Sequence, residues 1–352
     1  MNHNQTDHQP RYRLRFAWLC LLFLAVFFGS FLLGRYRVSP ASLFSILGCK
    51  LAELVSFGRV VPVRTWTGME EAAIWNIRLP RILCAMLVGA ALSTAGAAYQ
   101  GMFRNPMVSP DLLGASTGAG FGAALGILLS LDYFGITLTA FCFGLAAVLL
   151  AYTFSRFSRL ERTLSMVLSG VMISSLFSAG TSFIKLVADT EDQLPAITYW
   201  LMGSLSSVRG RDTLFAFVPI FVGVVPLCLL RWRINLLTVS EAEARSMGVH
   251  TDRLRLAVIL CATLMTAASV AVSGMIGWVG LVIPHFCRML FGYDYRRLIP
   301  ASMLLGGTFL MAVDDLARLV TTSELPLGIL TAFVGAPVFI YLIVTGGGSR
   351  EA

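Results

Sequence analysis

The sequence has 352 residues, of which 57% are hydrophobic and only 13% are charged. Its mean hydropathy of +0.77 and its repeated apolar runs, long enough to cross a bilayer core of about 30 Å, exclude a soluble globular enzyme and predict a polytopic membrane protein. The formal net charge of +8 follows from basic residues gathered on one side of a membrane, so it implies no nucleic-acid partner.

Ten apolar segments are predicted to cross the membrane as helices, which makes the fold all-α and brings both chain ends to one side. They are residues 16–34, 79–103, 112–130, 135–155, 163–187, 213–231, 256–275, 278–292, 298–315 and 326–345. Because bundled spans share one core, residues 16–345 are expected to form a single transmembrane domain. Polar tails precede and follow it at 1–15 and 346–352, and residues 1–10 are expected to be disordered. The pattern does not fix the boundaries within 274–292, where glycines interrupt the apolar run.

Lysine and arginine residues close to the ends of spans stay in the cytoplasm. Placing both termini there puts 16 of the 27 lysine and arginine residues inside. Tight basic clusters within 156–162 and 231–233 support this orientation, whereas the basic residues of 35–81 oppose it. We therefore expect cytoplasmic termini.

Four glycines, Gly114, Gly118, Gly122 and Gly126, recur at four-residue spacing in the third apolar segment. Small residues at this spacing let two helices approach closely. Part of the run, "GAGFG", resembles a nucleotide-binding loop, but no strand precedes it. Close helix packing is therefore the preferred interpretation.

The chain carries no residue set typical of catalysis. Its two lysines, Lys50 and Lys185, lie outside any phosphate-binding loop, so work driven by ATP would need a second subunit. His285 in "GLVIPHFCR" is interpreted as a structural histidine, and the seven cysteines as packing residues without a CxxC pair. We expect a transport subunit that is not an enzyme and holds no metal or cofactor.

The charged stretch "SEAEARSMGVHTDRLR" begins at Ser240, in the longest predicted inner loop. Ser240 and Glu243 have the spacing of a capping box. Glu241 and Arg245 lie one turn apart, and Gly248 suits the left-handed residue after a last helical turn. Because a helix of about two turns is unstable alone, this stretch is either a helix that packs on another chain or a solvated connecting loop.

Two acidic residues, Asp314 and Asp315, lie at the outer end of a predicted span, where charge is costly. Arg318 follows four and three residues later, so a local ion pair is one interpretation. A proton-coupling site is the alternative.

Four stretches carry a resemblance to a known family. They are "IRLPRILCAMLVGAALSTAGAAYQGMFRNPMVSPDLLGASTGAG" (77–120), "YWLMGSL" (199–205), "GMIGWVGLVIPHFCRMLFG" (274–292) and "ELPLGILTAFVGAPVFIYL" (324–342). In this order and spacing they closely resemble the FecCD family, the membrane permeases of ATP-binding-cassette (ABC) importers for iron siderophores, haem and vitamin B12. The resemblance extends from about residue 16 to 345.

The resemblance implies the vitamin B12 permease-like importer fold, in a bacterial inner membrane. It also implies a second permease copy, two cytoplasmic ABC ATPases that bind ATP and Mg²⁺, and an external substrate-binding protein. The complete set of motifs permits a homodimer, and a heterodimer stays open. Residues 240–248, with Met247, match the family's coupling helix, which docks in a cleft of the ATPase.

Further residues carry over from the family one position at a time. Arg78 and Arg81 in "RLPR", with Arg318 in "ARLVTTSELP", resemble the outward-facing arginines that receive acidic residues of the binding protein. The residues themselves also allow span-end positions for Arg78 and Arg81, and for Arg318 an ion pair within its own helix.

The cytoplasmic gate is the other site that the resemblance implies. Asn105, Pro106 and Met107 in "RNPMVSP" resemble the inner gate of the family. Thr163 and Leu164 align with its second element, although the sequence around them departs from the family pattern. Helices around 163–187 and 326–345 would line the path.

The resemblance leaves the cargo open. An iron siderophore is the first expectation, and vitamin B12, haem or an oxyanion such as molybdate are alternatives. A secondary transporter is a more remote reading, because it predicts acidic residues at midplane and internal repeats with broken helices.

Overall fold

The structure is a computed structural model that describes residues 8–34, 36, 38–55, 66–239, 241–321 and 324–346. Every regular element formed by these residues is a helix. The predicted all-α fold is therefore confirmed.

The first half of the chain forms seven numbered α-helices and two short turns of other helix types. They are α1 (His8–Leu32), α2 (Pro40–Val55), α3 (Gly68–Ala72), the π-helical η1 (Ala73–Arg78), α4 (Leu79–Met102), the 3-10 turn η2 (Pro110–Leu113), α5 (Ala115–Leu128), α6 (Tyr133–Phe157) and α7 (Arg162–Val187).

The second half continues the helical bundle. Its elements are α8 (Gln193–Met202), α9 (Gly210–Leu237), α10 (Glu241–Ser246), α11 (Thr251–Ser273), α12 (Val279–Phe291), α13 (Tyr295–Leu319) and α14 (Leu327–Gly346).

Ten apolar helices match the ten predicted spans one for one. Among the described residues, seven helices are long and apolar enough to cross a membrane, and the shorter apolar helices α5, α12 and α14 complete the set. The polytopic membrane fold is thus confirmed.

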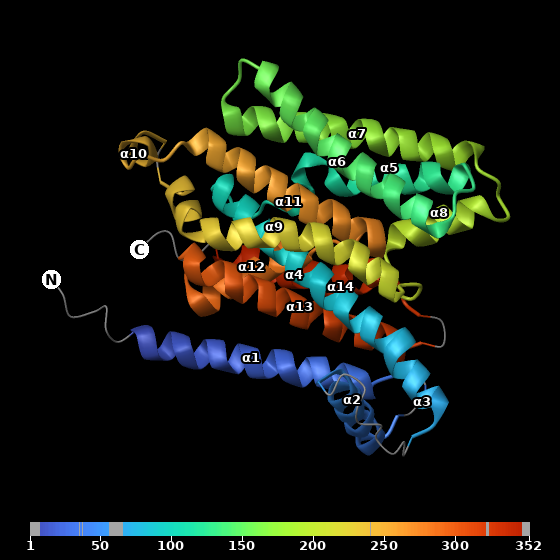
Figure 1. The fold of residues 1–352 in the computed structure, drawn as a ribbon. Coiled ribbons are helices and arrows are strands. Elements are labelled where there is room, and N and C mark those ends of the chain that lie inside the picture. Colours follow the sequence, from blue (N-terminus) through green and yellow to red (C-terminus); the bar gives the residue numbers. More distant parts are fainter. Residues whose placement is uncertain are drawn as a thin grey trace.

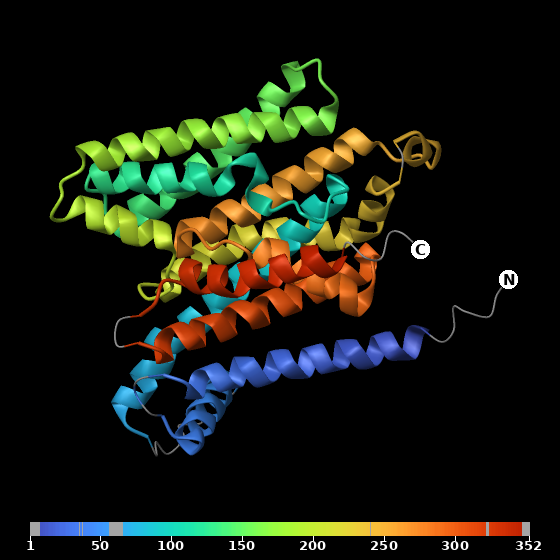
Figure 2. The same ribbon diagram turned by 180° about the vertical axis from the view of Figure 1, so that it is seen from behind.

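The centre of the bundle is formed by α4, α11 and α13. In the most apolar part of each helix, 78% of the residues are buried in the stretch that contains α4, 72% in α11 and 67% in α13. The corresponding values are 17% for α1 and 22% for α7. Figures 1 and 2 show α1 along one margin of the bundle and α7 along the other. The outer helices present apolar side chains outward, as a lipid-facing surface requires.

Opposite ends of the bundle carry different elements. The start of α1, the end of α14 and the small helix α10 lie at one end in both views, whereas α2, α3 and α8 lie at the other (Figures 1 and 2). The end with α10 is called the inner end below, and the end with α2 the outer end.

The helical stretch that contains α4 begins earlier than predicted. From Gly68 to Met102 it is continuous for 35 residues, a rise of about 52 Å that exceeds the bilayer core of about 30 Å. The start expected at residue 79 is corrected because a capping box at Thr67 opens the helix. Glu70 N donates to Thr67 Oγ1 at 3.3 Å, and Thr67 N donates to Glu70 Oε2 at 2.9 Å. This polar extension is invisible to a hydropathy pattern.

For residues 8–10 the expected disorder is corrected, because α1 already begins at His8. The rings of Tyr12 and Phe16 lie 5.8 Å and 6.2 Å from the ring of Phe291 in α12. These contacts stabilise the polar first turns of α1. The first seven residues, like the last six of the predicted C-terminal tail, lie outside the described residues.

The boundary within 274–292, which the sequence pattern did not fix, is a sharp break between two helices. Gly274 has φ +67° and Trp278 has φ +70°, and α11 ends before the first while α12 begins after the second. A Cβ on Gly274 would lie 2.3 Å from the carbonyl oxygen of Trp200, so glycine is required there both by conformation and by space.

The glycine stripe packs α5 against α6, as predicted. A Cβ on Gly118 would lie 2.6 Å from Phe143 O, and one on Gly122 would lie 2.5 Å from Thr139 O. Absence of these side chains lets the two helix backbones meet.

Candidate functional site

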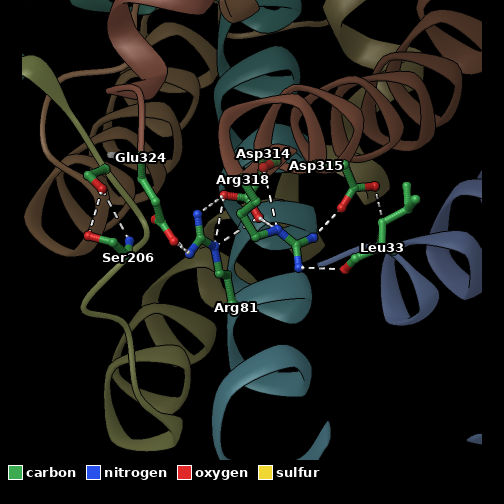
Figure 3. Close-up of polar contacts among 9 residues, drawn as sticks. Leu33, Arg81, Ser206, Asp314, Asp315, Arg318 and Glu324 are labelled. Atoms are coloured by element: carbon green, nitrogen blue, oxygen red, sulfur yellow. Dashed lines mark hydrogen bonds and ion pairs between the residues drawn. The ribbon is translucent and has the colours of Figure 1, made fainter. Parts of the chain in front are cut away.

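Six charged side chains form a cluster at the outer end, where α1, η1, α4, α13 and the segment before α14 meet. Figure 3 labels all of them except Arg78. This outer charge cluster consists of Arg78, Arg81, Asp314, Asp315, Arg318 and Glu324. The three arginines expected to face a binding protein are thus brought together, and their exposed fractions are only 4%, 5% and 7%.

Arg81 lies between two carboxylates. Its Nη2 and Nε donate to Asp314 at 2.8 and 3.0 Å, while its Nη1 donates to Glu324 Oε2 at 2.8 Å (Figure 3). The side chain of Asp314 is 1% exposed and that of Glu324 is 23% exposed. Arg81 therefore joins the core helix α13 to the partly open segment that leads into α14.

Arg318 forms the second half of the cluster within its own helix. It pairs with Asp315, and its Nε lies 3.2 Å from Asp314 Oδ2. Its Nη1 also donates to Leu33 O at 3.3 Å, at the end of α1. The hydroxyl of Ser30 donates to Asp315 Oδ2 at 2.6 Å. The local ion pair considered for Arg318 is present, and it extends to α1.

Among the described residues, the hydrogen bonds of Arg78 go to backbone oxygens. Its two terminal nitrogens donate to the carbonyls of Phe31 and Tyr36. Phe31 lies in the last turn of α1 and Tyr36 lies just beyond its end, so Arg78 binds this end of the helix as a cation at a helix C-terminus does.

These contacts decide what the cluster can do chemically. A buried charge is tolerated only when it is paired and hydrogen-bonded, and three cations face three anions here. Asp314 and Asp315 are both engaged by arginine, which favours the ion-pair interpretation over proton coupling. Docking through these arginines remains a prediction, and it would require a partner's carboxylate to reach nitrogens that already have acceptors.

The inner end carries the segment expected to bind an ATPase. The helix α10 covers Glu241–Ser246, and Ala244 is fully buried while Met247 is 55% exposed. Gly248 has φ +76°, and Val249 N donates to Ala244 O at 3.2 Å, which closes the helix as predicted. Ser240 lies outside the described residues, so the capping box is untested. The side chains of Glu241 and Arg245 likewise lie outside the description, whereas that of Glu243 is exposed.

The expected gate residues Asn105, Pro106 and Met107 are exposed in the loop that follows α4. Asn105 Oδ1 accepts from Met107 N at 2.9 Å, and Val108 N donates to Asn105 O at 3.3 Å. These bonds make residues 104–108, called the gate loop below, a compact turn.

The second gate element lies at the start of α7. Leu164 is 48% exposed and Thr163 is half-buried. Glu161 caps the helix, and its carboxylate accepts the backbone N–H groups of Thr163 and Leu164, which lowers the pKa of Glu161 below its usual range. The cap fixes the orientation of this helix end.

An apolar groove of about 640 Å³ lies where α8, the break between α11 and α12, and α14 meet. No charged side chain lines it. The lining residues are Leu201, Met202, Met275, Gly277, Trp278, Gly328, Ile329, Ala332, Phe333 and Ala336. Among the described residues, no group of three or more His, Cys, Asp or Glu side chains could hold a metal ion.

The sequence analysis missed one member of the outer charge cluster, Glu324, and the hydrogen-bond donor Ser30. Glu324 lies in the "SELP" stretch, 243 residues from Arg81, and Ser30 lies in an apolar helix, 285 residues from Asp315. The one sequence signal for Glu324 was its position next to a predicted span that begins with proline. No feature of the sequence indicated a role for Ser30.

Comparison with known proteins gives a consistent result. The model of the FecCD transport family matches residues 21–345. The molybdate import system permease protein MolB of Haemophilus influenzae is 38% identical over 97% of this chain and 99% of its own length. An iron chelatin transport system permease protein of Helicobacter pylori is 43% identical over 77% of this chain and 82% of its own length.

A solved structure shares the fold. It is described as an inward-facing conformation of a metal-chelate type ABC transporter, and it is 38% identical with a TM-score of 0.83. The match covers 95% of this chain and 99% of that one. Fold and sequence therefore agree over nearly the whole chain.

Proposed function

This chain belongs to the FecCD transport family and is a multi-pass ABC importer permease, and we propose that its cargo is an iron chelate of the siderophore type. The match over residues 21–345 carries the assignment. The chain is proposed to lie in a bacterial inner membrane with both termini in the cytoplasm. It would not hydrolyse ATP itself.

The proposed machinery has three further components. Two cytoplasmic ABC ATPases bind ATP and Mg²⁺ and contact α10, a second permease copy completes the path, and an external binding protein delivers the cargo. ATP closes the ATPase dimer, α10 moves, and the cavity between the permeases changes the side that it faces. Cargo passes because its affinity differs between the two states. A homodimer is the simplest form of this assembly.

The apolar groove supports an organic chelate as the cargo. Its lining offers no charged group and no metal-binding set. A bare anion entering such a surface would lose hydration without gaining hydrogen bonds. A chelate encloses its metal in an organic shell and avoids this cost.

Molybdate is the second candidate cargo. The relative named as a molybdate permease covers nearly the full length of this chain, while the relative named for iron chelatin covers about three quarters of it. Haem and vitamin B12 remain open within the same machinery.

The first experiment is to tag the chain, solubilise it gently from its own host and identify co-purifying proteins by mass spectrometry. An ABC ATPase at one copy per permease is the expected result. A chain that purifies alone and moves solute on an ion gradient would contradict the proposal and favour a secondary transporter.

The cargo is then read from the binding protein recovered with the complex. Elemental analysis of that protein, loaded from host extract, is expected to show iron together with an organic ligand. Molybdenum without an organic ligand would replace the iron-chelate proposal by the molybdate candidate.

A further inference from the structure

Each of the two expected gate elements follows directly after an arginine that contacts a helix next to α10 in the chain, α9 for the first and α11 for the second. Arg104 precedes Asn105, and Arg162 precedes Thr163. The contact of Arg104 lies just before α10 in the chain, and the contact of Arg162 lies just after it. The two gate elements are thus linked to opposite flanks of one short helix.

The contact of Arg104 is a charge-assisted cap. Its Nε donates to the carbonyl oxygen of Leu237 at 2.8 Å. Leu237 is the last residue of α9, and the final carbonyls of a helix have no partner within it. A guanidinium at this position satisfies the carbonyl and complements the helix dipole.

The backbone of Arg104 is held in an unusual conformation. Its φ of +52° lies in the left-handed region, which costs a non-glycine residue roughly 1 kcal/mol. The same turn aims the side chain at α9 while the next residues form the compact gate loop. In the chain, α9 ends at Leu237 and α10 begins four residues later, at Glu241.

The contact of Arg162 lies on the other flank. Its Nη1 pairs with the carboxylate of Asp252, the second residue of α11. The neighbouring Glu161 is influenced by the charge of Arg255. Glu161 and Arg162 at the start of α7 thus interact with Arg255 and Asp252, respectively, at the start of α11. The pair of Arg162 and Asp252 is 44% and 53% exposed, so it contributes orientation more than stability.

We propose that Arg104 and Arg162 are positioning residues that transmit displacement of α10 to the gate loop and to the start of α7. This rests on the proposed function, because it takes α10 as the ATPase-coupling element. Leu237 is 1% exposed and α10 is anchored by the buried Ala244, so movement of α10 shifts the end of α9. Arg104 then carries that shift to Asn105 and Met107.

The test measures the gate loop directly and needs no cargo. Met107→Cys is introduced into the complex with its co-purified ATPase in nanodiscs, and its labelling rate by a charged maleimide is compared with and without ATP, Mg²⁺ and vanadate. The same complex without Met107→Cys corrects for the native cysteines. Only assembled complexes are compared.

Arg104→Asn removes the donor and keeps a residue that tolerates the left-handed conformation. We expect it to reduce the nucleotide-dependent change in labelling by about tenfold, since a charge-assisted bond is lost. Arg104→Lys keeps the charge and should retain part of the change. The control Arg233→Asn removes an exposed cation of the last turns of α9 and should leave the change intact.

A second pair of variants tests the proposal in case the complex with Arg104→Asn does not assemble. With the reporter at Leu164→Cys, Arg162→Asp should reduce the change, and the charge swap with Asp252→Arg should restore it. Wild-type labelling changes in both Arg104→Asn and Arg162→Asp would overturn the positioning role alone. A reference complex whose labelling ignores nucleotide would overturn the assignment of α10 and the gate, and this inference with it.

Discussion

Arg81 shows how one residue governs the outer charge cluster. Its guanidinium satisfies Asp314, which is 1% exposed, and Glu324, which is 23% exposed. Breaking a buried pair by removing one partner leaves an uncompensated charge, while replacing both partners can be nearly neutral. The energetics of the cluster are therefore expected to be strongly non-additive.

The prediction for this pair is a double-mutant cycle. Arg81→Met and Asp314→Leu should each destabilise the protein by about 3 kcal/mol or more, and the double variant should cost clearly less than their sum. The melting temperatures of the purified variants measure this. Additive losses would show that the pair does not interact in the membrane.

Glu324 occupies a nitrogen of Arg81 that a docking carboxylate would need. If Arg81 receives the binding protein, Glu324→Gln should strengthen binding up to about fivefold, because a competing rim charge is removed. Affinity of the recovered binding protein for the nanodisc complex is the measurement, and Glu324→Asp is the matched control. Unchanged affinity in the Gln variant would place docking elsewhere on the outer end.

At the scale of elements, small residues decide how closely helices approach. The contact of α5 with α6 depends on positions where a Cβ would meet backbone oxygen below 3 Å. Such an oxygen cannot move aside without moving its helix. The spacing of the glycines predicted this contact, but it could not identify α6 as the partner.

Gly118→Ala and Gly122→Ala should both lower the yield and melting temperature of the folded protein by separating α5 from α6. Gly29→Ala is the matched control, since nothing lies within 4 Å of a Cβ there. A normal melting temperature for Gly122→Ala would contradict the observed backbone approach.

Gly248 ends α10 in a left-handed conformation with open space around it. Gly248→Asp is expected to abolish assembly with the ATPase or its coupling while the chain still inserts, because it adds a charge where α10 would dock. Gly248→Asn has the same shape and tolerates the conformation, so it should retain more activity. Assembly is measured by co-purification, and cargo uptake at the wild-type level in the Asp variant would refute a coupling role for α10.

At the scale of the whole molecule, the arrangement of the ends follows from the number of spans. Ten apolar helices, of which seven are long enough to cross a membrane among the described residues, bring the start of α1 and the end of α14 to the end that holds α10 (Figure 1). Docking of an ATPase requires that this end faces the cytoplasm.

Orientation is tested with cysteine labelling in intact cells and in permeabilised cells. A cysteine at Asp189, exposed in the connection from α7 to α8, should react with an impermeant reagent in intact cells. One at Arg253, near the start of α11, should react only after permeabilisation. The reverse pattern would invert the topology and exclude an importer with an inner ATPase.

The sequence by itself determined the class of the protein, the ten spans and the positions of its motifs. Apolar runs must be helical in lipid, because every backbone polar group has to be satisfied within the segment. The left-handed Gly248 and the close packing at Gly118 likewise follow from short-range spacing. The polar start of the first core helix at Thr67 was missed because hydropathy does not register a capped extension into water.

Only the tertiary structure decided the distant partners of Arg81 and Arg104. Arg81 is 233 residues from Asp314, and Arg104 is 133 residues from Leu237. Such pairs depend on which helices become neighbours in the bundle, and a pattern of residues along the chain does not predict which helices pack together. Arg81, expected to be an outward-facing docking group, is buried for the same reason, since Asp314 and Glu324, the carboxylates that permit its burial, come from the far end of the chain.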